Sequence, residues 1–219
     1  MPGRRRTRAL LAAALAAVIL GIAGVVAGAV LGWDGDAGPG GDASVAAESF
    51  RGNAPPAAFV APDFALRDAL SGDLVRMSDQ RGRVVVLTFL ESKCTAACPL
   101  IASQLAEALR RLPLQERADV VALAVSADPR DDTGGSVRAF LGRHRAVGQV
   151  RYLNRPHAEL RRVWKDYQVL SASASGDADT HSAPVRIYSR SGRWLATEHA
   201  GADLSADNLV HDISLALAR

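Results

Sequence analysis

Cysteine is scarce in this chain, whose 219 residues include only Cys94 and Cys98. A scaffold of scattered structural disulfides needs more cysteines at wider separations, so the sequence excludes that class of protein. The net charge is a modest +3 and much of the positive excess lies at the extreme N-terminus, so nucleic-acid binding is not indicated. The chain also lacks an internal repeat, a Ser/His/Asp arrangement, a phosphate-binding glycine loop and a zinc signature.

A long uncharged run stands near the N-terminus. Arginines within the first eight residues precede residues 9–32, which carry no charge, and Trp33 follows. About 20 apolar residues cross a bilayer core as a helix. Arginines before such a run favour a cytoplasmic N-terminus, and a tryptophan suits the far interface. We therefore expect residues 1–33 to be a basic cytoplasmic N-terminus and a single-pass transmembrane anchor in the cell membrane.

A cleaved signal peptide is the alternative for the same segment, although its apolar region is usually only about 7–15 residues long. Both interpretations leave the rest of the chain, including the two cysteines, outside the cytoplasm, where disulfides persist. Residues 34–57 follow, rich in Gly, Ala, Asp and Pro and without apolar periodicity. This composition is typical of a flexible linker that holds a domain off the membrane.

The remaining residues, 58–219, alternate between strand and helix patterns, which predicts an α/β domain with a central sheet flanked by helices. Residues 84–90 form an uninterrupted apolar run typical of a buried central strand. The polar residues 171–179 are expected to be a loop. Further strands are expected in residues 120–125 and 150–153, hairpins in 62–77 and 185–197, and helices in 99–112, 137–144, 160–167 and 205–217.

The two cysteines stand between the strand 84–90 and the helix that Pro99 opens. Ligands bind at the carboxyl ends of strands in open α/β sheets. The free N–H groups and partial positive charge of a helix N-terminus stabilise a thiolate, so we expect the cysteine pKa to fall. A thiolate both binds metals and attacks disulfides. Three residues separate Cys94 from Cys98, which suits a pair of metal thiolates but does not forbid a disulfide.

Four stretches together resemble one family, the SCO/SenC copper chaperones of the thioredoxin-like superfamily. They are residues 82–89, the sequence Cys94-x-x-x-Cys98-Pro99, residues 125–133 with their Ser-x-Asp-Pro pattern, and residues 179–182 around His181. The resemblance covers roughly residues 60–219. One departure is Thr95, which stands where the family usually has proline.

The resemblance implies a thioredoxin-like SCO-type domain in residues 58–219 and copper as the bound ion. Its ligands would be Cys94, Cys98 and His181, and two soft thiolates with an imidazole suit Cu(I). The implied function is extracytoplasmic assembly: copper delivery to, or cysteine reduction at, the copper site of a respiratory cytochrome c oxidase, with an oxidase subunit as client. Asp128 would orient a ligand or, equally well, be a simple turn aspartate.

A membrane-anchored thiol–disulfide oxidoreductase of the thioredoxin/redoxin type is the main alternative, so enzymatic activity stays open, with the chaperone favoured. It would use Cys94 and Cys98 as a redox-active pair without His181, and Pro184 would match the cis-proline of thioredoxin-type reductases. A redoxin-type peroxidase and a module with a fixed disulfide are weaker alternatives. The other histidines, at positions 144, 157, 199 and 211, are expected to be solvated or hydrogen-bonded, with His144 at the surface.

Overall fold

The computed structural model describes residues 49–56, 58–177, 179 and 181–219. They belong to the compact unit Ala47–Arg219. The expected anchor in residues 1–33 and most of the linker lie outside the described residues and stay predictions. Within the described part of the chain, no helix has the length and apolar character needed to span a membrane.

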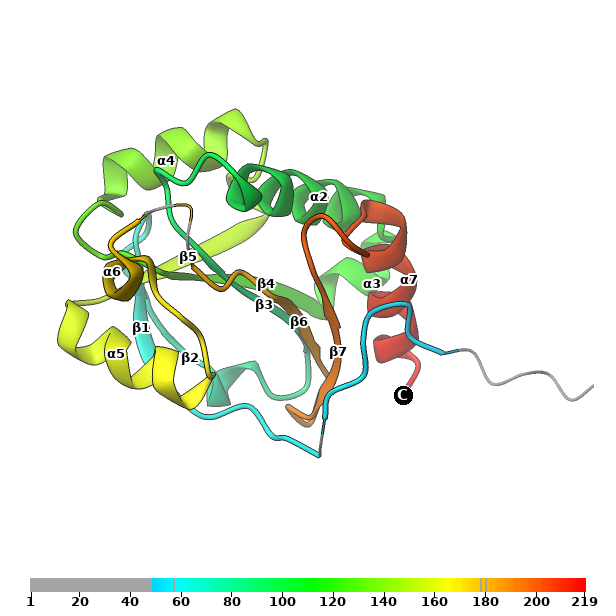
Figure 1. The fold of residues 1–219 in the computed structure, drawn as a ribbon. Helices are drawn as coiled ribbons and strands as arrows, with labels where there is room; N and C mark the ends of the chain where they lie inside the picture. The colour runs from blue at the N-terminus through cyan, green and yellow to red at the C-terminus, as the bar shows by residue number, and fades with distance from the viewer. Residues whose placement is uncertain (1–48, 57, 178, 180) are drawn as a thin grey trace, which may run out of the picture. The chain divides into compact units, whose positions relative to one another are not determined.

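A seven-stranded mixed sheet forms the centre of this unit, in the order β2-β1-β5-β4-β3-β6-β7 (Figure 1). Its three middle strands are parallel, and an antiparallel hairpin extends the sheet on each side. Every residue of β3 is buried, as expected for a central strand covered on both faces. The strands are β1 (Ala65–Asp68), β2 (Leu74–Arg76), β3 (Val84–Leu90), β4 (Val120–Ser126), β5 (Val150–Asn154), β6 (Val185–Tyr188) and β7 (Trp194–Glu198).

Helices cover both faces of the sheet and bury a separate apolar cluster on each (Figure 1). On one face, α2 (Ala97–Arg111), α4 (Gly134–Arg143) and α7 (Ala206–Leu217) pack over the alternate residues Val84, Val86 and Leu90 of β3. On the other face, α5 (His157–Asp166) packs over Val85, Leu87 and Phe89. The period-2 alternation of β3 thus sends successive side chains into different cores.

The predicted α/β class and the predicted strands and main helices are confirmed, with two corrections. Residues 171–179 are not entirely loop, because α6 (Ala172–Ser175) forms one turn there. Ser171 caps it by accepting a hydrogen bond from the Ala174 N–H, and Gly176 ends it at φ 78°, which glycine adopts without steric cost. Two further short helices were not predicted, η1 (Ser78–Gln80) and α3 (Leu114–Ala118), and α3 buries none of its residues.

The chain that leads into the sheet is fixed against β7 and α7. The Asn53 N–H donates to the Thr197 carbonyl at 2.8 Å, and the Thr197 N–H returns a bond of 2.9 Å. The Asp212 carboxylate accepts from the backbone N–H groups of Arg51 and Gly52 at 2.8 and 2.9 Å. A Cβ at Gly52 would lie 2.9 Å from the Thr197 carbonyl oxygen, so this close approach requires glycine.

Candidate metal centre

The pairing of β3 with β6 brings two distant segments together. The cysteine loop follows β3 directly, and His181 lies four residues before β6. Because β6 runs antiparallel to β3, the chain entering β6 lies at the same end of the sheet as the chain leaving β3. This topology places His181 beside Cys94 and Cys98.

The three predicted ligands converge at this end of the sheet. His181 Nε2 lies 3.2 Å from Cys98 Sγ. One ligand atom from each of Cys94, Cys98 and His181 can be chosen so that all lie within 4.8 Å of one another. Both cysteines are free thiols, Cys98 fully buried and Cys94 4% exposed, while His181 is half-buried. The arrangement offers two buried sulfurs and one half-buried nitrogen.

The ring of His181 is oriented by its own backbone neighbour. Nδ1 lies 3.3 Å from the Ser182 carbonyl oxygen, which can only accept a hydrogen bond. The proton therefore belongs on Nδ1 in the neutral ring, and the Nε2 lone pair faces the sulfurs. Metal-binding histidines are typically held in this way, with the second ring nitrogen bonded to a carbonyl or carboxylate.

The two thiols differ sharply in acidity. A hydrogen bond from the Cys98 thiol lowers the pKa of Cys94 to about 5, with further help from His181 and backbone N–H groups at the start of α2. The same coupling, together with burial, raises the pKa of Cys98. The expectation of a lowered pKa was therefore right for Cys94 and wrong for Cys98. A second thiolate beside the first is unfavourable until a cation joins them.

The pKa of His181 is also affected by the negative charge of Cys94. Burial alone would lower its pKa, but the hydrogen bond with Cys94, the Ser182 carbonyl and the charges of Cys94 and Glu91 raise it overall. A metal needs the thiolate forms of both cysteines and the neutral imidazole. A metal bound here would therefore displace the proton of Cys98 and compete with protonation of His181, whereas Cys94 already supplies a thiolate at neutral pH.

Asp179 joins the histidine loop to the cysteine loop, a role that sequence reasoning missed. Its Oδ1 accepts hydrogen bonds from the N–H groups of Thr95 and Ala96 at 2.6 and 3.0 Å, and its Oδ2 accepts from the Thr95 hydroxyl at 2.8 Å. These bonds lower the pKa of Asp179 to about 2, so the carboxylate stays ionised at physiological pH. A proline at position 95 would have no N–H to donate, and Thr95 therefore replaces the family's usual residue with a donor pair.

Two more buried carboxylates, of Asp132 and Glu91, lie close to the cysteine loop. Asp132, in the stretch that carries the family resemblance, accepts from the Ser92 N–H at 2.8 Å and from the Ser126 hydroxyl at 2.6 Å. The Tyr152 hydroxyl lies 2.7 Å from the same carboxylate. Asp132 thus fixes the ends of β3, β4 and β5 relative to one another. Glu91 is buried at the end of β3, and burial, followed by the charge of Asp132, raises its pKa to about 7.

The other residues considered from sequence have ordinary structural roles. Asp128 accepts hydrogen bonds from the backbone N–H and the guanidinium of Arg130, as a turn aspartate does. The peptide bond before Pro184 is trans, since the described residues contain no cis bond, so the cis-proline interpretation is wrong. Trans is the default because it is the more stable isomer of most X–Pro bonds.

All four remaining histidines are solvated or hydrogen-bonded as predicted, although His144 is less exposed than expected. His157 and His199 are exposed, and His211 Nδ1 lies 2.8 Å from the Asp212 carboxylate. His144 is half-buried, not at the surface as expected. Its ring packs edge-on to Phe140, one turn earlier on α4, and lies 3.2 Å from the Ser103 hydroxyl of α2.

The chain matches one protein family and is similar in fold to several solved structures. The model of the SCO1/SenC family matches residues 52–217. Among solved structures, apo Sco1 from Thermus thermophilus gives a TM-score of 0.63 at 22% identity, over 78% of this chain and 98% of that chain. Copper-bound ScoI from Bradyrhizobium japonicum gives 0.59 at 21% identity, over 72% and 99%. No curated protein matches the chain.

A thioredoxin-type structure is similar as well. The thioredoxin domain of a thiol-disulfide oxidoreductase from Bacteroides vulgatus gives a TM-score of 0.55 at 16% identity, over 72% of this chain and 94% of that chain. At these identities the structural likenesses establish the fold, which is thioredoxin-like. The expected α/β thioredoxin-like class is thereby confirmed for the described residues.

Proposed function

Because the chain belongs to the SCO1/SenC family, we propose that it is a copper-binding assembly factor. It delivers copper to, or reduces the cysteines of, the copper site of a respiratory cytochrome c oxidase, whose copper-bearing subunit is its client. The convergence of Cys94, Cys98 and His181 within 4.8 Å carries this proposal. The copper-bound structures of ScoI from Bradyrhizobium japonicum and Arabidopsis thaliana support it.

The donor set fits copper and is unsuited to metals that prefer oxygen ligands. Thiolates are soft ligands that favour Cu(I), and imidazole suits copper in either oxidation state. Calcium and magnesium prefer oxygen ligands. Copper is the cargo in this function, so a half-buried His181 on a segment outside the strands and helices is an advantage. A ligand group of the client can displace the half-buried His181 more readily than it can displace a buried cysteine sulfur. Copper can then pass to the client.

We propose further that the domain works outside the cytoplasm, attached to the cell membrane through residues 1–33. The apolar run of residues 9–32 and the arginines before it support this location. Respiratory oxidase copper sites in a membrane would then be within reach of a domain on a linker of residues 34–57. Expression of the chain with a reporter at its C-terminus, read on the two sides of the membrane, tests this location.

Copper retention by the reduced protein tests the function directly. We expect the full-length chain, purified in a nonionic detergent, to keep one Cu(I) per molecule against the chelator bicinchoninate. X-ray absorption at the copper edge should show sulfur neighbours. The oxidised protein, in which Cys94 and Cys98 are joined, should not retain Cu(I). If the reduced protein yields its copper to the chelator completely, the copper-binding function is wrong.

A thiol–disulfide oxidoreductase is the second candidate, and the low pKa of Cys94 favours it. A thiolate at neutral pH beside a protonated Cys98 is the arrangement that attacks a disulfide and then resolves the mixed disulfide. His181→Ala separates the two functions. It should abolish copper retention in the chaperone while leaving insulin reduction intact in the oxidoreductase.

The hydrogen bonds of Asp179 to the cysteine loop should affect copper affinity, although Asp179 is not one of the three proposed ligands. We expect Asp179→Asn to lower Cu(I) affinity about 10- to 100-fold, the usual cost of losing a residue that holds a ligand in place. Asp207→Asn, which removes an exposed carboxylate of α7, is the matched control and should bind copper normally. Chelator competition measures both. Equal affinities for the two variants would show that Asp179 does not position His181.

A further inference from the structure

Arg186 on β6 carries a charge that no carboxylate of the described residues neutralises. Its side chain is buried, with the residue only 8% exposed. An η nitrogen donates to the Tyr167 carbonyl at 2.7 Å, and the guanidinium stacks 4.6 Å from the centre of the Trp194 ring. Nε is buried without a partner among the described residues. Buried arginines are almost always paired with an anion.

The phenols beside Arg186 do not provide the missing negative charge. The Tyr188 hydroxyl is buried and has no hydrogen-bond partner among the described residues. Burial raises the pKa of Tyr188 to about 12, and burial also raises the pKa of Tyr167. Both phenols are therefore neutral at physiological pH. The cation–π contact with Trp194 stabilises the guanidinium in part but leaves most of its donors unused.

Arg186 lines two neighbouring hollows that also share Gln168. The larger, of about 400 Å³, is bordered by His181, His199 and the start of α2 at Ala97. The smaller, of about 140 Å³, lies against Trp194 and the chain before β1. No acidic side chain lines either hollow. A volume of about 400 Å³ lies within the range of small-molecule sites.

We propose that the two hollows beside Arg186 form a binding site for a carboxylate group, which Arg186 recognises through its guanidinium. The planar fork of donors matches the two oxygens of a carboxylate, and such charge-assisted pairs are the strongest hydrogen bonds in proteins. Because His181 borders the larger of the two hollows, a carboxylate bound there lies near the candidate metal centre. An acidic side chain of a copper-accepting partner, seated on Arg186, would be oriented toward His181.

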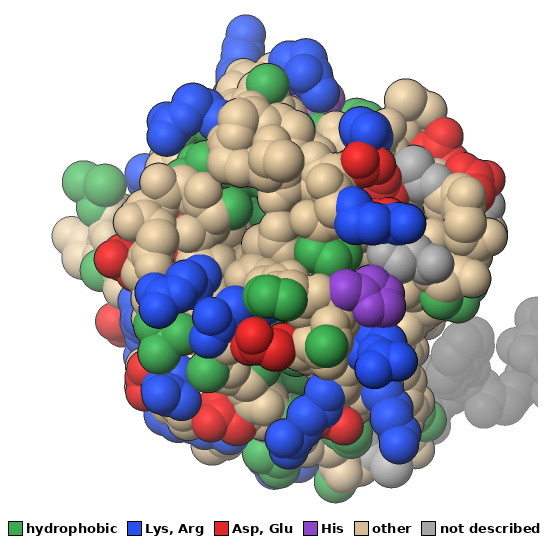
Figure 2. Space-filling view, turned by 90° about the vertical axis from the view of Figure 1, so that its left-hand side faces the viewer, with side chains coloured by type: hydrophobic (Ala, Val, Ile, Leu, Met, Phe, Trp, Pro, Cys, Tyr) green, Lys and Arg blue, Asp and Glu red, His purple; other side chains and the backbone are tan. Residues whose placement is uncertain are grey.

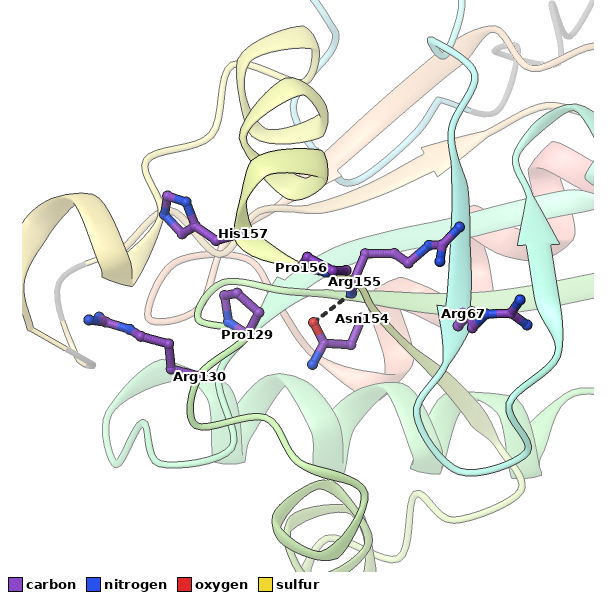
Figure 3. A pocket seen from close by; sticks show the side chains of 7 residues that line it. All are labelled: Arg67, Pro129, Arg130, Asn154, Arg155, Pro156 and His157. Atoms are coloured by element: carbon purple, nitrogen blue, oxygen red, sulfur yellow. Dashed lines mark hydrogen bonds between the residues drawn. The ribbon is translucent and has the colours of Figure 1, made fainter.

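A second hollow is also lined by arginines, but these arginines are paired with carboxylates, unlike Arg186. It lies on the α5 side of the molecule, where Figure 2 shows many Lys and Arg side chains, and Figure 3 shows its lining. Arg130 there pairs with Asp128 at 2.8 Å, and Arg155 with Glu159 at 3.2 Å. Their charges are already compensated, and the Arg130 side chain is 72% exposed. Arg130 is therefore the matched control for Arg186.

Acetate binding to the metal-free protein tests the site, and it does so independently of copper. We expect acetate, titrated at constant ionic strength, to shift the Trp194 indole and His181 ring signals of the reduced full-length chain in NMR spectra, and to saturate. Arg186→Gln should lower the acetate affinity at least about tenfold, Arg186→Lys should lower it less, and Arg130→Gln should leave it unchanged.

A peptide pair then identifies the source of the carboxylate. A short peptide with one glutamate that saturates below the acetate concentration, while its glutamine counterpart does not bind, supports an acidic side chain of a partner. Tighter binding of acetate than of either peptide supports a free small carboxylate at the same site. Linear shifts without saturation in the wild-type protein would overturn the site, as would equal saturation in folded Arg186→Gln.

Discussion

Replacing Cys98 with serine is expected to lower Cu(I) affinity by a factor on the order of 10³ or more, because losing a ligand costs more than the 10- to 100-fold of changes around the ligands. Cys98 is fully buried and its sulfur lies 3.2 Å from His181 Nε2. Serine is close to cysteine in size, so the start of α2 keeps its packing. A hydroxyl is a hard, protonated ligand, however, and it cannot replace a thiolate on Cu(I).

Cys94→Ser should cause a loss of similar size, and chelator competition on the reduced variants measures both. His199→Ala is the matched control, because His199 is exposed and borders the neighbouring hollow without lying among the three ligands. Circular dichroism of each variant checks that the fold is intact. Cu(I) affinity in folded Cys98→Ser within tenfold of the wild-type value would contradict the assignment of this sulfur as a ligand.

The cysteine position was predictable from local pattern, whereas the partner of the cysteines was not. An apolar run followed at once by Cys94 and a helix-starting Pro99 indicates a site at a strand end, and the structure has it there. His181 has no such local signal. It reaches the site only because β6 pairs antiparallel with β3, a contact between chain segments that local periodicity does not register, so only the family resemblance pointed to it.

The supporting carboxylates escaped sequence reasoning for a related reason. Asp179 binds N–H groups 83 and 84 positions away, and Asp132 binds the Ser92 N–H 40 positions away. Backbone donors are present at every residue, so nothing in the composition identifies which of them a carboxylate will meet. Both aspartates do lie in stretches that carried the resemblance. The departure at Thr95, which weakened the resemblance, is explained by its two hydrogen bonds to Asp179.

The difference in acidity between Cys94 and Cys98 could not be predicted from the local sequence either. The helix N-terminus predicts a lowered pKa for both thiols, yet only Cys94 follows. The difference arises because a proton shared between two close sulfurs stabilises one thiolate at the expense of the other. That asymmetry gives the reduced site one thiolate and one thiol at neutral pH. The site is therefore prepared both for a metal cation and for attack on a disulfide.

Buried Glu198 should contribute strongly to the pH dependence of stability. Glu198, at the end of β7, is fully buried, and neither carboxylate oxygen has a hydrogen-bond partner among the described residues. Burial, followed by the charge of Asp212, raises its pKa from 4.5 to about 8. Asp212 itself is hydrogen-bonded to the N–H groups of Arg51 and Gly52. Ionising Glu198 would therefore place two negative charges near each other beneath the incoming chain.

The sign of this effect follows from proton linkage. Above pH 4.5 the unfolded chain releases the Glu198 proton, while the native state holds it until about pH 8. The native state thus binds more protons across that window, and its free energy of unfolding falls as the pH rises. Below pH 4.5 both states are protonated, and Glu198 adds no pH dependence.

Glu198→Gln should remove this loss, because glutamine keeps the shape of the protonated side chain and cannot ionise. We expect the variant to exceed the wild type in free energy of unfolding by roughly 2 to 4 kcal/mol at pH 9, and by much less at pH 4.5. Urea denaturation at the two pH values measures the difference. Glu159→Gln, at a largely exposed position of α5, is the control and should show little change at either pH. An equal gain for Glu198→Gln at both pH values would mean that the amide packs better, and that the charge of Glu198 is not what destabilises the fold.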